Sequence, residues 1–370
     1  MTEVDVGKTE REAGEPSVSA AGDPVADENS LQILTSILSQ RNWQPLGEPE
    51  PGIPRRGSNP FPEGEEALET LFAREGIRSM KIHLLDGTYE LFRAHHAMPS
   101  SIVTPDGRRI GAVRGLMQSV LSLLREDDVT HLACAFDHVI LSYRNQLYDG
   151  YKTGEDTPPE LLAQFDIAER AVRSLGVVVW PMVEFEADDA IATAAARWWD
   201  APGVEQVVMA SPDKDLAQMV RGRRIVALDR RREVMLDEDG VLEKFGVPPA
   251  SIADYLALVG DSADGIPGIP RWGAKSAAAV LSRYGHIEAI PESVEDWDVL
   301  VRGAKTMAEN LASSREKAML YKRLATLRTD VPIAESLDDL RWTGLRDREF
   351  GALCRELGFN RISPVPQAKG

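Results

Sequence analysis

The sequence predicts an α/β fold in which a mostly parallel central sheet is flanked by helices and followed by a helical region. Between residues 76 and 240, short apolar runs typical of buried strands alternate with longer segments whose apolar residues recur at helical spacing. Such alternation places parallel strands between layers of helices. After about residue 240 the pattern is helical throughout.

Residues 1–75 form an acidic extension. They contain 15 Asp and Glu against 6 Lys and Arg, so they carry −9 of the formal net charge of −17. Residues 1–30 mix acidic residues with Gly, Ser and Ala and lack an apolar period, which is typical of disorder. The segment 31–38 favours a short amphipathic helix, and the Pro- and Gly-rich segment 45–62 is typical of a linker. The composition assigns this extension no function.

The α/β core is expected over residues 76–240. Its predicted strands are short and apolar, and several stop just before an Asp or a Ser. These strands cover residues 80–85, 131–136, 176–180, 206–210 and 224–228. Apolar residues at helical spacing predict helices over residues 110–124, 161–175 and 187–199.

Residues 241–345 are expected to form a helical region, and residues 346–370 a final helix and tail. Within this region the segment Gly265-Ile-Pro-Gly268-Ile-Pro-Arg-Trp-Gly273-Ala-Lys275 precedes an Ala-rich run. Its glycines permit a tight turn with exposed backbone groups, and the Ala-rich run is a strong helix former. The turn amides, the helix N-terminus and Lys275 could bind phosphate. A plain turn between two helices explains the same pattern.

Composition bounds the class of protein. A chain of 370 residues with 43% hydrophobic content can bury a substantial core. Its two cysteines, Cys134 and Cys354, lack the paired spacing of a zinc site. No apolar stretch approaches the ~20 residues of a membrane span, and the acidic N-terminus differs from a secretory signal. We therefore expect a cytoplasmic protein with no membrane contact.

Nine carboxylates lie in five short clusters, most of which follow a predicted strand or begin a predicted helix. Parallel strands present their carboxyl ends along one edge of a sheet, so these side chains are expected to converge. Converging like charges repel one another unless cations neutralise them. The nine residues are Asp86, Asp137, Glu186, Asp188, Asp189, Asp213, Asp215, Asp261 and Asp264.

Oxygen ligands without His or Cys partners favour Mg²⁺ or Mn²⁺ over Zn²⁺. Nine carboxylates exceed the needs of one ion, so we expect two ions, with some acids acting through water or supporting the ligands. Two ions ~3.5–4 Å apart would suit phosphodiester cleavage. Each cluster alone has another explanation: the acid pairs spaced three apart could cap helices, the first Asp could end a strand in a turn, and the 213–215 cluster could be a solvated loop.

Residues 142–152 interleave aromatic and basic side chains, among them Arg144, Tyr151 and Lys152. Stacking on bases combined with phosphate neutralisation would use this mixture. A solvated helix with buried tyrosines explains it as well. The same two explanations apply to Tyr89 and Arg93, which follow Asp86 at helical spacing, and Arg93 could instead pair with a metal-site carboxylate.

In their order along the chain, these motifs resemble the bacterial 5′ nucleases: the 5′→3′ exonuclease domain of DNA polymerase I with its stand-alone and flap-endonuclease relatives. The resemblance covers about residues 80–340 and implies a PIN-like core. It rests on Leu85-Asp86-Gly87 with Arg93, Phe136-Asp137, Tyr151-Lys152, Glu186-Ala-Asp188-Asp189, Asp213-Lys-Asp215, and Gly260-Asp261-Ser-Ala-Asp264 running into Gly265-Ile-Pro-Gly268. The full series is highly specific.

The resemblance implies a nuclease with two Mg²⁺ or Mn²⁺ ions that removes nucleotides from DNA 5′ ends and cuts 5′ flaps. Replication, repair and removal of RNA-containing primers, together with proteins of those processes, would be its setting. It implies inner metal ligands or their close support at Asp86, Asp137, Glu186, Asp188 and Asp213. It places Asp215, Asp261 and Asp264 nearest a second metal, and Asp189 among the remaining acids.

The resemblance also implies how DNA is held. Residues 260–285 are similar to the family's helix–hairpin–helix, which grips the duplex backbone, commonly with K⁺ on main-chain carbonyls; Gly265, Gly268, Gly273 and Lys275 are its candidate contacts. Residues 140–160 correspond to the arch that threads the single strand. Arg93, Arg144 and Lys152 would orient or stabilise the scissile phosphate, and Tyr89 and Tyr151 would contact DNA.

The sequence departs from the family at three places. Thr153-Gly-Glu155-Asp156 stands where the family continues toward another basic residue, which leaves arch grip and 5′-phosphate preference open. Gly265 stands where Asn is common, and Ser211-Pro212 replaces a small residue plus Gly. At 370 residues we expect a monomer that acts without an attached polymerase.

Two other functions stay open at this point. A DNA-junction-binding protein without catalysis would keep the glycine-rich hairpin, although the intact carboxylates weigh against it. A metal-dependent phosphatase acting on small molecules is suggested by Asp86-Gly87-Thr88. That function would leave the hairpin without a purpose.

Overall fold

The structure is a computed structural model that describes residues 80–359, 362 and 366. The expected extension over residues 1–75, with its helix at 31–38 and linker at 45–62, lies outside the described residues. The expected helix at the end of the chain is present as α14 (Asp347–Leu357). No helix of the described part is long and apolar enough to cross a membrane.

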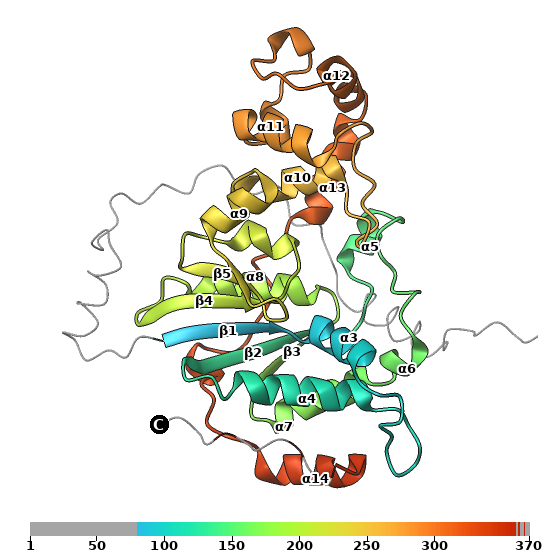
Figure 1. Cartoon of the computed structure of the whole chain (residues 1–370), viewed down its shortest axis with the longest axis vertical. Coiled ribbons are helices and arrows are strands. Elements are labelled where there is room, and N and C mark those ends of the chain that lie inside the picture. Colours follow the sequence, from blue (N-terminus) through green and yellow to red (C-terminus); the bar gives the residue numbers. More distant parts are fainter. Residues whose placement is uncertain (1–79, 360–361, 363–365, 367–370) are drawn as a thin grey trace, which may run out of the picture. The chain divides into compact units, whose positions relative to one another are not determined.

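A six-stranded sheet forms the centre of the described part, with strand order β3-β2-β1-β4-β5-β6 (Figure 1). All neighbouring strands are parallel except β5 and β6, which are antiparallel. The fold class predicted from the sequence is thereby confirmed. The strands are β1 (Met80–Asp86), β2 (Val129–Asp137), β3 (Val178–Met182), β4 (Val204–Ala210), β5 (Ile225–Asp229) and β6 (Val234–Leu236).

The five expected strands are all present, each within a few residues of its predicted bounds. Strand β6 was not predicted, because three residues are too few to show an apolar alternation. It lies at the edge of the sheet, where Val234 and Met235 are about half exposed (46% and 51%).

Helices cover both faces of the sheet. On one face, Leu85, Cys134 and Phe136 pack with α3 (Gly87–Ala97), α4 (Gly111–Leu123), α7 (Phe165–Ser174) and α14. On the other face, Ile82, Leu84 and Ala135 pack with α8 (Ala187–Trp198) in one continuous core with the helical region. Alternate residues of β1 therefore face the two layers, as the two-residue period of a strand requires.

The helix expected over residues 161–175 is two helices, α6 (Pro159–Leu162) and α7. The break falls at Ala163-Gln164. The buried Gln164 amide donates to Glu160 O at 2.8 Å and accepts from Val113 N at 3.4 Å. A side chain that bonds backbone in this way competes with continuous helix.

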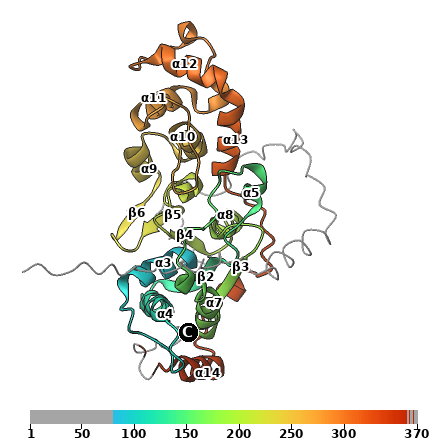
Figure 2. The same ribbon diagram turned by 90° about the vertical axis from the view of Figure 1, so that its right-hand side faces the viewer.

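The helical region after residue 237 is confirmed, and it adjoins the face of the sheet that α8 covers (Figure 2). Helix α10 is followed by a long glycine-rich turn and then α11, as expected for residues 260–285. The helices of this region are α9 (Glu238–Phe245), α10 (Ile252–Val259), α11 (Ala274–Tyr284), α12 (Ala304–Ser313) and α13 (Arg315–Ala325). Short 3-10 segments join these elements, and the segment relevant to the site is η1 (Asp215–Met219).

Candidate metal centre

The carboxyl ends of β1, β2 and β4 bring the first acids together. Asp86 ends β1, Asp137 ends β2, and Asp213 follows β4. Strand β1 pairs with β2 on one side and with β4 on the other. The strands that follow β1 are thus added first on one side of it, as β2 and β3, and then on the other, as β4 to β6. Ligands of open α/β sheets bind at such a switch point, just beyond the strand ends.

The remaining acids come from helix starts and one turn. Glu186 is the N-cap of α8, and Asp188 and Asp189 lie in the first turn of that helix. Asp215 begins η1, and Asp261 and Asp264 lie in the turn after α10. Acidic groups at a helix start are favoured by the positive end of the helix dipole, which explains why this sequence tolerates them there.

Asp86, Asp137, Asp188 and Asp213 form the inner acid group. Asp86 is buried, Asp137 and Asp188 are half-buried, and Asp213 is exposed. Loss of hydration in this crowded site raises the pKa of each carboxyl, that of Asp86 to about 7. Mutual repulsion adds to this effect: Asp137 and Asp213 raise the pKa of Asp86, and Asp213 and Asp86 raise that of Asp188. These carboxyls therefore lie close enough for their negative charges to repel one another, and a bound cation would neutralise that repulsion.

Asp215, Asp261 and Asp264 form the outer acid group. Each offers a carboxylate oxygen, and the three oxygens lie within 4.8 Å of one another. Burial, followed by repulsion from Asp213, Asp264 and Asp261, raises the pKa of Asp215 well above its ordinary value. The Lys214 ammonium lies 2.5 Å from Asp261 Oδ2, so one positive charge already faces this group.

The residues present fit divalent cations. Asp188 Oδ1 and Asp215 Oδ1 are buried and have no hydrogen-bond partner among the described residues. A buried charged oxygen without a partner is costly, and a metal ion would satisfy it. One such oxygen belongs to each acid group, and the donors are all carboxylates, which suits Mg²⁺ or Mn²⁺.

Lys152 joins the outer acid group to Glu186. Its ammonium lies 2.9 Å from Glu186 Oε2 and 2.9 Å from Asp264 Oδ1. Glu186 also accepts from Ser142 Oγ, from Arg144 Nη1 and from the Tyr151 hydroxyl. Burial opposes its ionisation, but Lys152 and Arg144 outweigh burial and lower the pKa of Glu186 to about 2. Both Glu186 oxygens are therefore occupied by partners within the chain.

Arg144 and Asp189 belong to neither acid group and are paired with each other. The Arg144 guanidinium donates to both oxygens of Asp189 at 2.7 Å, and to the carbonyls of Leu324 and Thr326. Both side chains are almost fully buried. In this placement the N–H groups of Arg144 and the oxygens of Asp189 are all engaged within the protein, which leaves no donor for a phosphate and no oxygen for a metal.

Arg93 also differs from its expected use. Its guanidinium donates to the buried Glu90 and to Ser119, and Glu90 binds Arg230 from the β5–β6 turn as well. Arg93 thus pairs with a carboxylate outside both acid groups. Tyr89 lies one turn away, partly buried, and its backbone N–H donates to Asp86 Oδ1 at 2.8 Å.

The glycine-rich turn after α10 packs against the arch segment. Lys152 N donates to Asp264 O at 3.1 Å. Gly265 has φ +74°, and a Cβ there would lie 2.1 Å from Gly150 O. Gly268 is equally confined, beside the backbone of Gly260. Gly273 and Lys275 are exposed at the start of α11. Of the four expected contacts, two are thus packing positions and two face solvent.

Several residues that support the site were not predicted as site residues. Ser211 Oγ donates to Asp86 Oδ2 at 2.9 Å, and Thr88 Oγ accepts from Asp137 N at 2.8 Å. Asp137 Oδ1 in turn accepts from the Ala187 amide. The Ser211-Pro212 departure was a signal for the first of these. Nothing local to Thr88 or Lys214 distinguishes them from ordinary turn residues.

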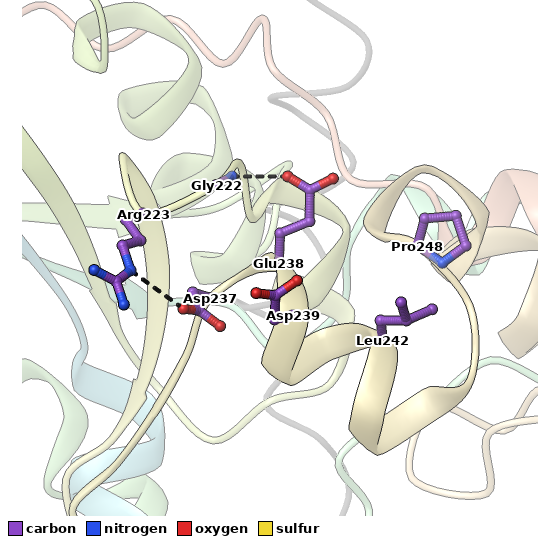
Figure 3. A pocket seen from close by; sticks show the side chains of 7 residues that line it. All are labelled: Gly222, Arg223, Asp237, Glu238, Asp239, Leu242 and Pro248. Atoms are coloured by element: carbon purple, nitrogen blue, oxygen red, sulfur yellow. Dashed lines mark hydrogen bonds and ion pairs between the residues drawn. The ribbon is translucent and has the colours of Figure 1, made fainter. Parts of the chain in front are cut away.

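A surface hollow elsewhere on the molecule contains none of the nine carboxylates. Figure 3 shows that the three acids Asp237, Glu238 and Asp239 lie between Gly222 and Arg223, from the turn before β5, and Leu242 and Pro248, from the segment around α9. Gly222 N donates to Glu238 at 2.9 Å, and Arg223 lies 3.7 Å from Asp237. Two of its three acids are thus engaged by neighbouring lining residues. The acid groups at the strand ends remain the candidate site.

Comparison with known sequences gives matches over most of the described chain. The family profile described as 5′-3′ exonuclease, N-terminal resolvase-like domain, matches residues 81–246, and that described as 5′-3′ exonuclease, C-terminal SAM fold, matches residues 247–348. DNA polymerase I of Pseudomonas aeruginosa is 38% identical over 280 residues, which are 75% of this chain and 30% of that protein. DNA polymerase I of Rhizobium leguminosarum is 38% identical over 267 residues, covering 70% of this chain and 26% of that protein. The chain spans less than a third of the length of these relatives.

Solved structures share the fold. The phage T5 D15 protein co-crystallised with metal ions has a TM-score of 0.54 at 15% identity, covering 75% of this chain and 99% of that chain. The T5 D15 flap endonuclease in a complex with DNA and metal ions has a TM-score of 0.53 at 17% identity, with the same coverage. Human GEN1 in complex with Holliday junction DNA has a TM-score of 0.52 at 12% identity, covering 77% of this chain and 69% of that chain.

Proposed function

Because the chain belongs to the 5′-3′ exonuclease family, we propose that it is a metal-dependent nuclease that hydrolyses DNA at 5′ ends and at 5′ flaps. The observation that carries this proposal is the pair of acid groups at the sheet edge. Within residues 80–359 each group has one buried carboxylate oxygen without a hydrogen-bond partner. Replication, repair and removal of RNA primers are its proposed setting, with a monomer in the cytoplasm and accessory proteins of those processes as partners.

Two Mg²⁺ or Mn²⁺ ions are proposed as cofactors. Asp86, Asp137, Asp188 and Asp213 would hold one, and Asp215, Asp261 and Asp264 the other. Bound there, the ions would supply an activated water and neutralise the charge that develops on the phosphate. The acids at the strand ends are set on rigid elements, since β1 and β2 are central strands and α8 is buried among them. Rigid placement favours catalysis by fixed charges.

Lys152 is proposed as the cation that contacts the scissile phosphate. Its ammonium is the positive group nearest to both Glu186 and Asp264, and its side chain is 31% exposed. Glu186, with its lowered pKa, would remain charged at neutral pH and hold Lys152 in place. Arg144 would hold Glu186 in position and would itself be held by Asp189. We propose these positioning roles in place of phosphate binding by Arg144 and metal binding by Asp189. Arg93 would help to tie α3 to Ser119 of α4.

The helical region is proposed to hold duplex DNA. The exposed Gly273 and Lys275 at the start of α11 support this, because helix amides and a lysine favour phosphate. Potassium at the carbonyls of the turn, and Tyr89 and Tyr151 near the single strand, belong to the same proposal. Tyr151 is buried and bonded to Glu186, so its hydroxyl would act by positioning that glutamate.

A cleavage assay tests the proposal. The full chain is incubated with a 5′-labelled flap duplex in Mg²⁺, in Mn²⁺ and in chelator. We expect cleavage near the junction that needs a divalent ion. Binding of the flap without cleavage in any metal would favour the alternative, a junction-binding protein without catalysis.

The Asp188→Ala variant locates the site. It removes a buried oxygen that has no hydrogen-bond partner in the described part of the chain. Cleavage should therefore fall at least ~100-fold while flap affinity in chelator stays within about threefold. Asp200→Ala, an exposed acid just beyond the other end of α8, is the matched control and should cut at the normal rate. Calorimetric titration with Mn²⁺ should show weaker binding in Asp188→Ala alone. Equal cleavage by both variants would refute this site.

A further inference from the structure

The β5–β6 hairpin carries a basic tip whose use the metal centre does not explain. Its four linking residues are Arg230-Arg231-Arg232-Glu233, between the paired ends Asp229 and Val234. Glu233 has φ +56°, a left-handed conformation that closes the turn. Arg231 and Arg232 are exposed, the latter with 73% of its side chain.

The base of the hairpin is held firmly. Arg230 donates to the buried Glu90 of α3 at 3.2 Å and to Ser119 of α4 at 2.8 Å. Asp229 accepts from the backbone amides of Arg231 and Arg232, at 3.0 and 3.1 Å, and pairs with the Arg232 guanidinium at 3.1 Å. The backbone of the tip is therefore held in place, and Arg230 and Arg232 are each paired with an acid. The Arg231 guanidinium is in no ion pair within the described residues.

The tip lies at the same edge of the sheet as the acid groups. Strand β5 is parallel to β4 and β1, so its end at Asp229 faces the same way as Asp86. It is two strands from β1, which at ~4.8 Å per strand puts it about 10 Å to the side. That distance is comparable with the widths of the duplex grooves, ~6 and ~12 Å.

Further positive groups connect the tip to the acids. The pKa of Lys244 in α9 is lowered mainly by burial. The charges of Arg232 and Asp213 also affect this pKa, so both groups lie near Lys244. Its ammonium also lies 4.9 Å from the Phe245 ring. Lys214 follows, against Asp261. Lys244 and Lys214 thus add positive charge between the hairpin and the outer acid group.

We propose that Arg231 and Arg232 bind the phosphate backbone of the duplex arm of the DNA, as a second grip in addition to α11. This inference rests on the proposed nuclease function and names a further part of its substrate surface. Arginines on a rigid turn suit phosphate, because their planar donor groups need little reordering on binding. Such contacts position DNA without reading its sequence.

The test measures DNA affinity without cleavage. Arg231→Glu/Arg232→Glu in the full chain is titrated with a flap duplex in chelator at several salt concentrations. We expect the Kd to rise about 10-fold and the salt dependence to lose about two counterions. Arg230 is left intact because it holds the hairpin. Arg231→Gln/Arg232→Gln serves as the milder variant, and circular dichroism melting checks that each variant is folded.

Arg348→Glu/Arg355→Glu is the matched control. It makes the same change in charge on α14, which packs on the other face of the sheet, and should leave the Kd within about twofold because its residues lie away from the acid groups. The hairpin variant should bind single-stranded DNA of the same length almost as tightly as the wild type does. An equal loss for single strand and duplex would overturn the assignment to the duplex.

The outcomes separate this inference from the proposed function. An unchanged flap Kd in both hairpin variants would overturn the inference and leave the nuclease proposal standing. A wild-type chain that binds the flap in chelator but never cuts in metal would overturn the nuclease proposal, while a weaker hairpin variant would still support the grip. A wild-type chain with no affinity for the flap would overturn both.

Discussion

Arg144 donates to both carboxylate oxygens of Asp189 at 2.7 Å, in a pair that is almost fully buried. The pair lies beneath Glu186, which accepts a further bond from Arg144 at 3.1 Å. It also anchors the chain after α13, because Asp189 accepts from the Arg328 amide. The arginine and the aspartate thus connect the arch segment, α8 and the end of the helical region.

Asp189→Ala should destabilise the protein strongly. Removing one partner of a buried pair leaves the other charge uncompensated, which costs about 3–5 kcal/mol in the free energy of unfolding. Urea unfolding measures it. Glu356→Ala, which breaks the exposed Arg170–Glu356 pair, is the control and should cost less than about 1 kcal/mol. An Arg144→Met variant that stays stable but loses cleavage would return Arg144 to a catalytic role.

The stability of the protein in chelator should fall as pH rises through about 7. Burial raises the pKa of the Asp86 carboxyl from 3.8 to about 7. Folded protein keeps this proton where the unfolded chain has lost it, so the contribution is full below pH 3.8 and lost above about 7. Urea unfolding between pH 5 and pH 8 should show a shallower decline for Asp86→Asn than for wild type.

Added Mg²⁺ should restore stability to the wild type above that pH, because the ion binds the deprotonated carboxylate. The Asp86→Asn variant should recover less. Identical pH profiles for the two proteins in chelator would show that Asp86 is not the group that titrates.

Gly265→Ala should destabilise the turn that joins the acid groups to the arch. The substitution combines a left-handed backbone with a Cβ placed 2.1 Å from Gly150 O, so we expect a loss of at least about 2 kcal/mol by urea unfolding. Gly273→Ala is the control, since its φ is −110° and no atom lies within 4 Å of the added Cβ. It should cost less than about 1 kcal/mol. Equal costs at both positions would argue against the contact with Gly150.

Lys152→Met should impair catalysis more than binding. Loss of one preorganised positive group at the phosphate is expected to lower kcat about 10²–10³-fold, while the flap Kd in chelator changes little. Lys275→Met should do the reverse, weakening binding and lowering the salt dependence by about one counterion, with kcat at saturating DNA unchanged. Single-turnover cleavage with separate binding titrations measures both. Normal cleavage by Lys152→Met would remove Lys152 from the proposed mechanism.

The sequence alone predicted the elements and the meeting of the acids. Apolar period is a local property of the chain, so β1 to β5 and the helical region could be placed from it. Asp86, Asp137 and Asp213 stand at or after predicted strand ends. Their convergence in space followed from the rule that parallel strands end along one edge of a sheet. Strand β6 was missed because its three residues are too few to show an apolar alternation. The break between α6 and α7 was missed because Gln164 there bonds Val113, 51 residues away in sequence.

Only the tertiary structure decided which of the nine carboxylates have oxygens left for a metal. Asp188 and Asp189 are adjacent in sequence, yet they differ in their partners. One buried oxygen of Asp188 has no partner among the residues that the structure describes, while both oxygens of Asp189 are bound by Arg144, 45 residues away. Glu186 is likewise taken by Lys152 and its neighbours. The hydrogen-bonding capacity of a carboxylate is a property of its residue type, but the partners that fill it meet only when the chain packs.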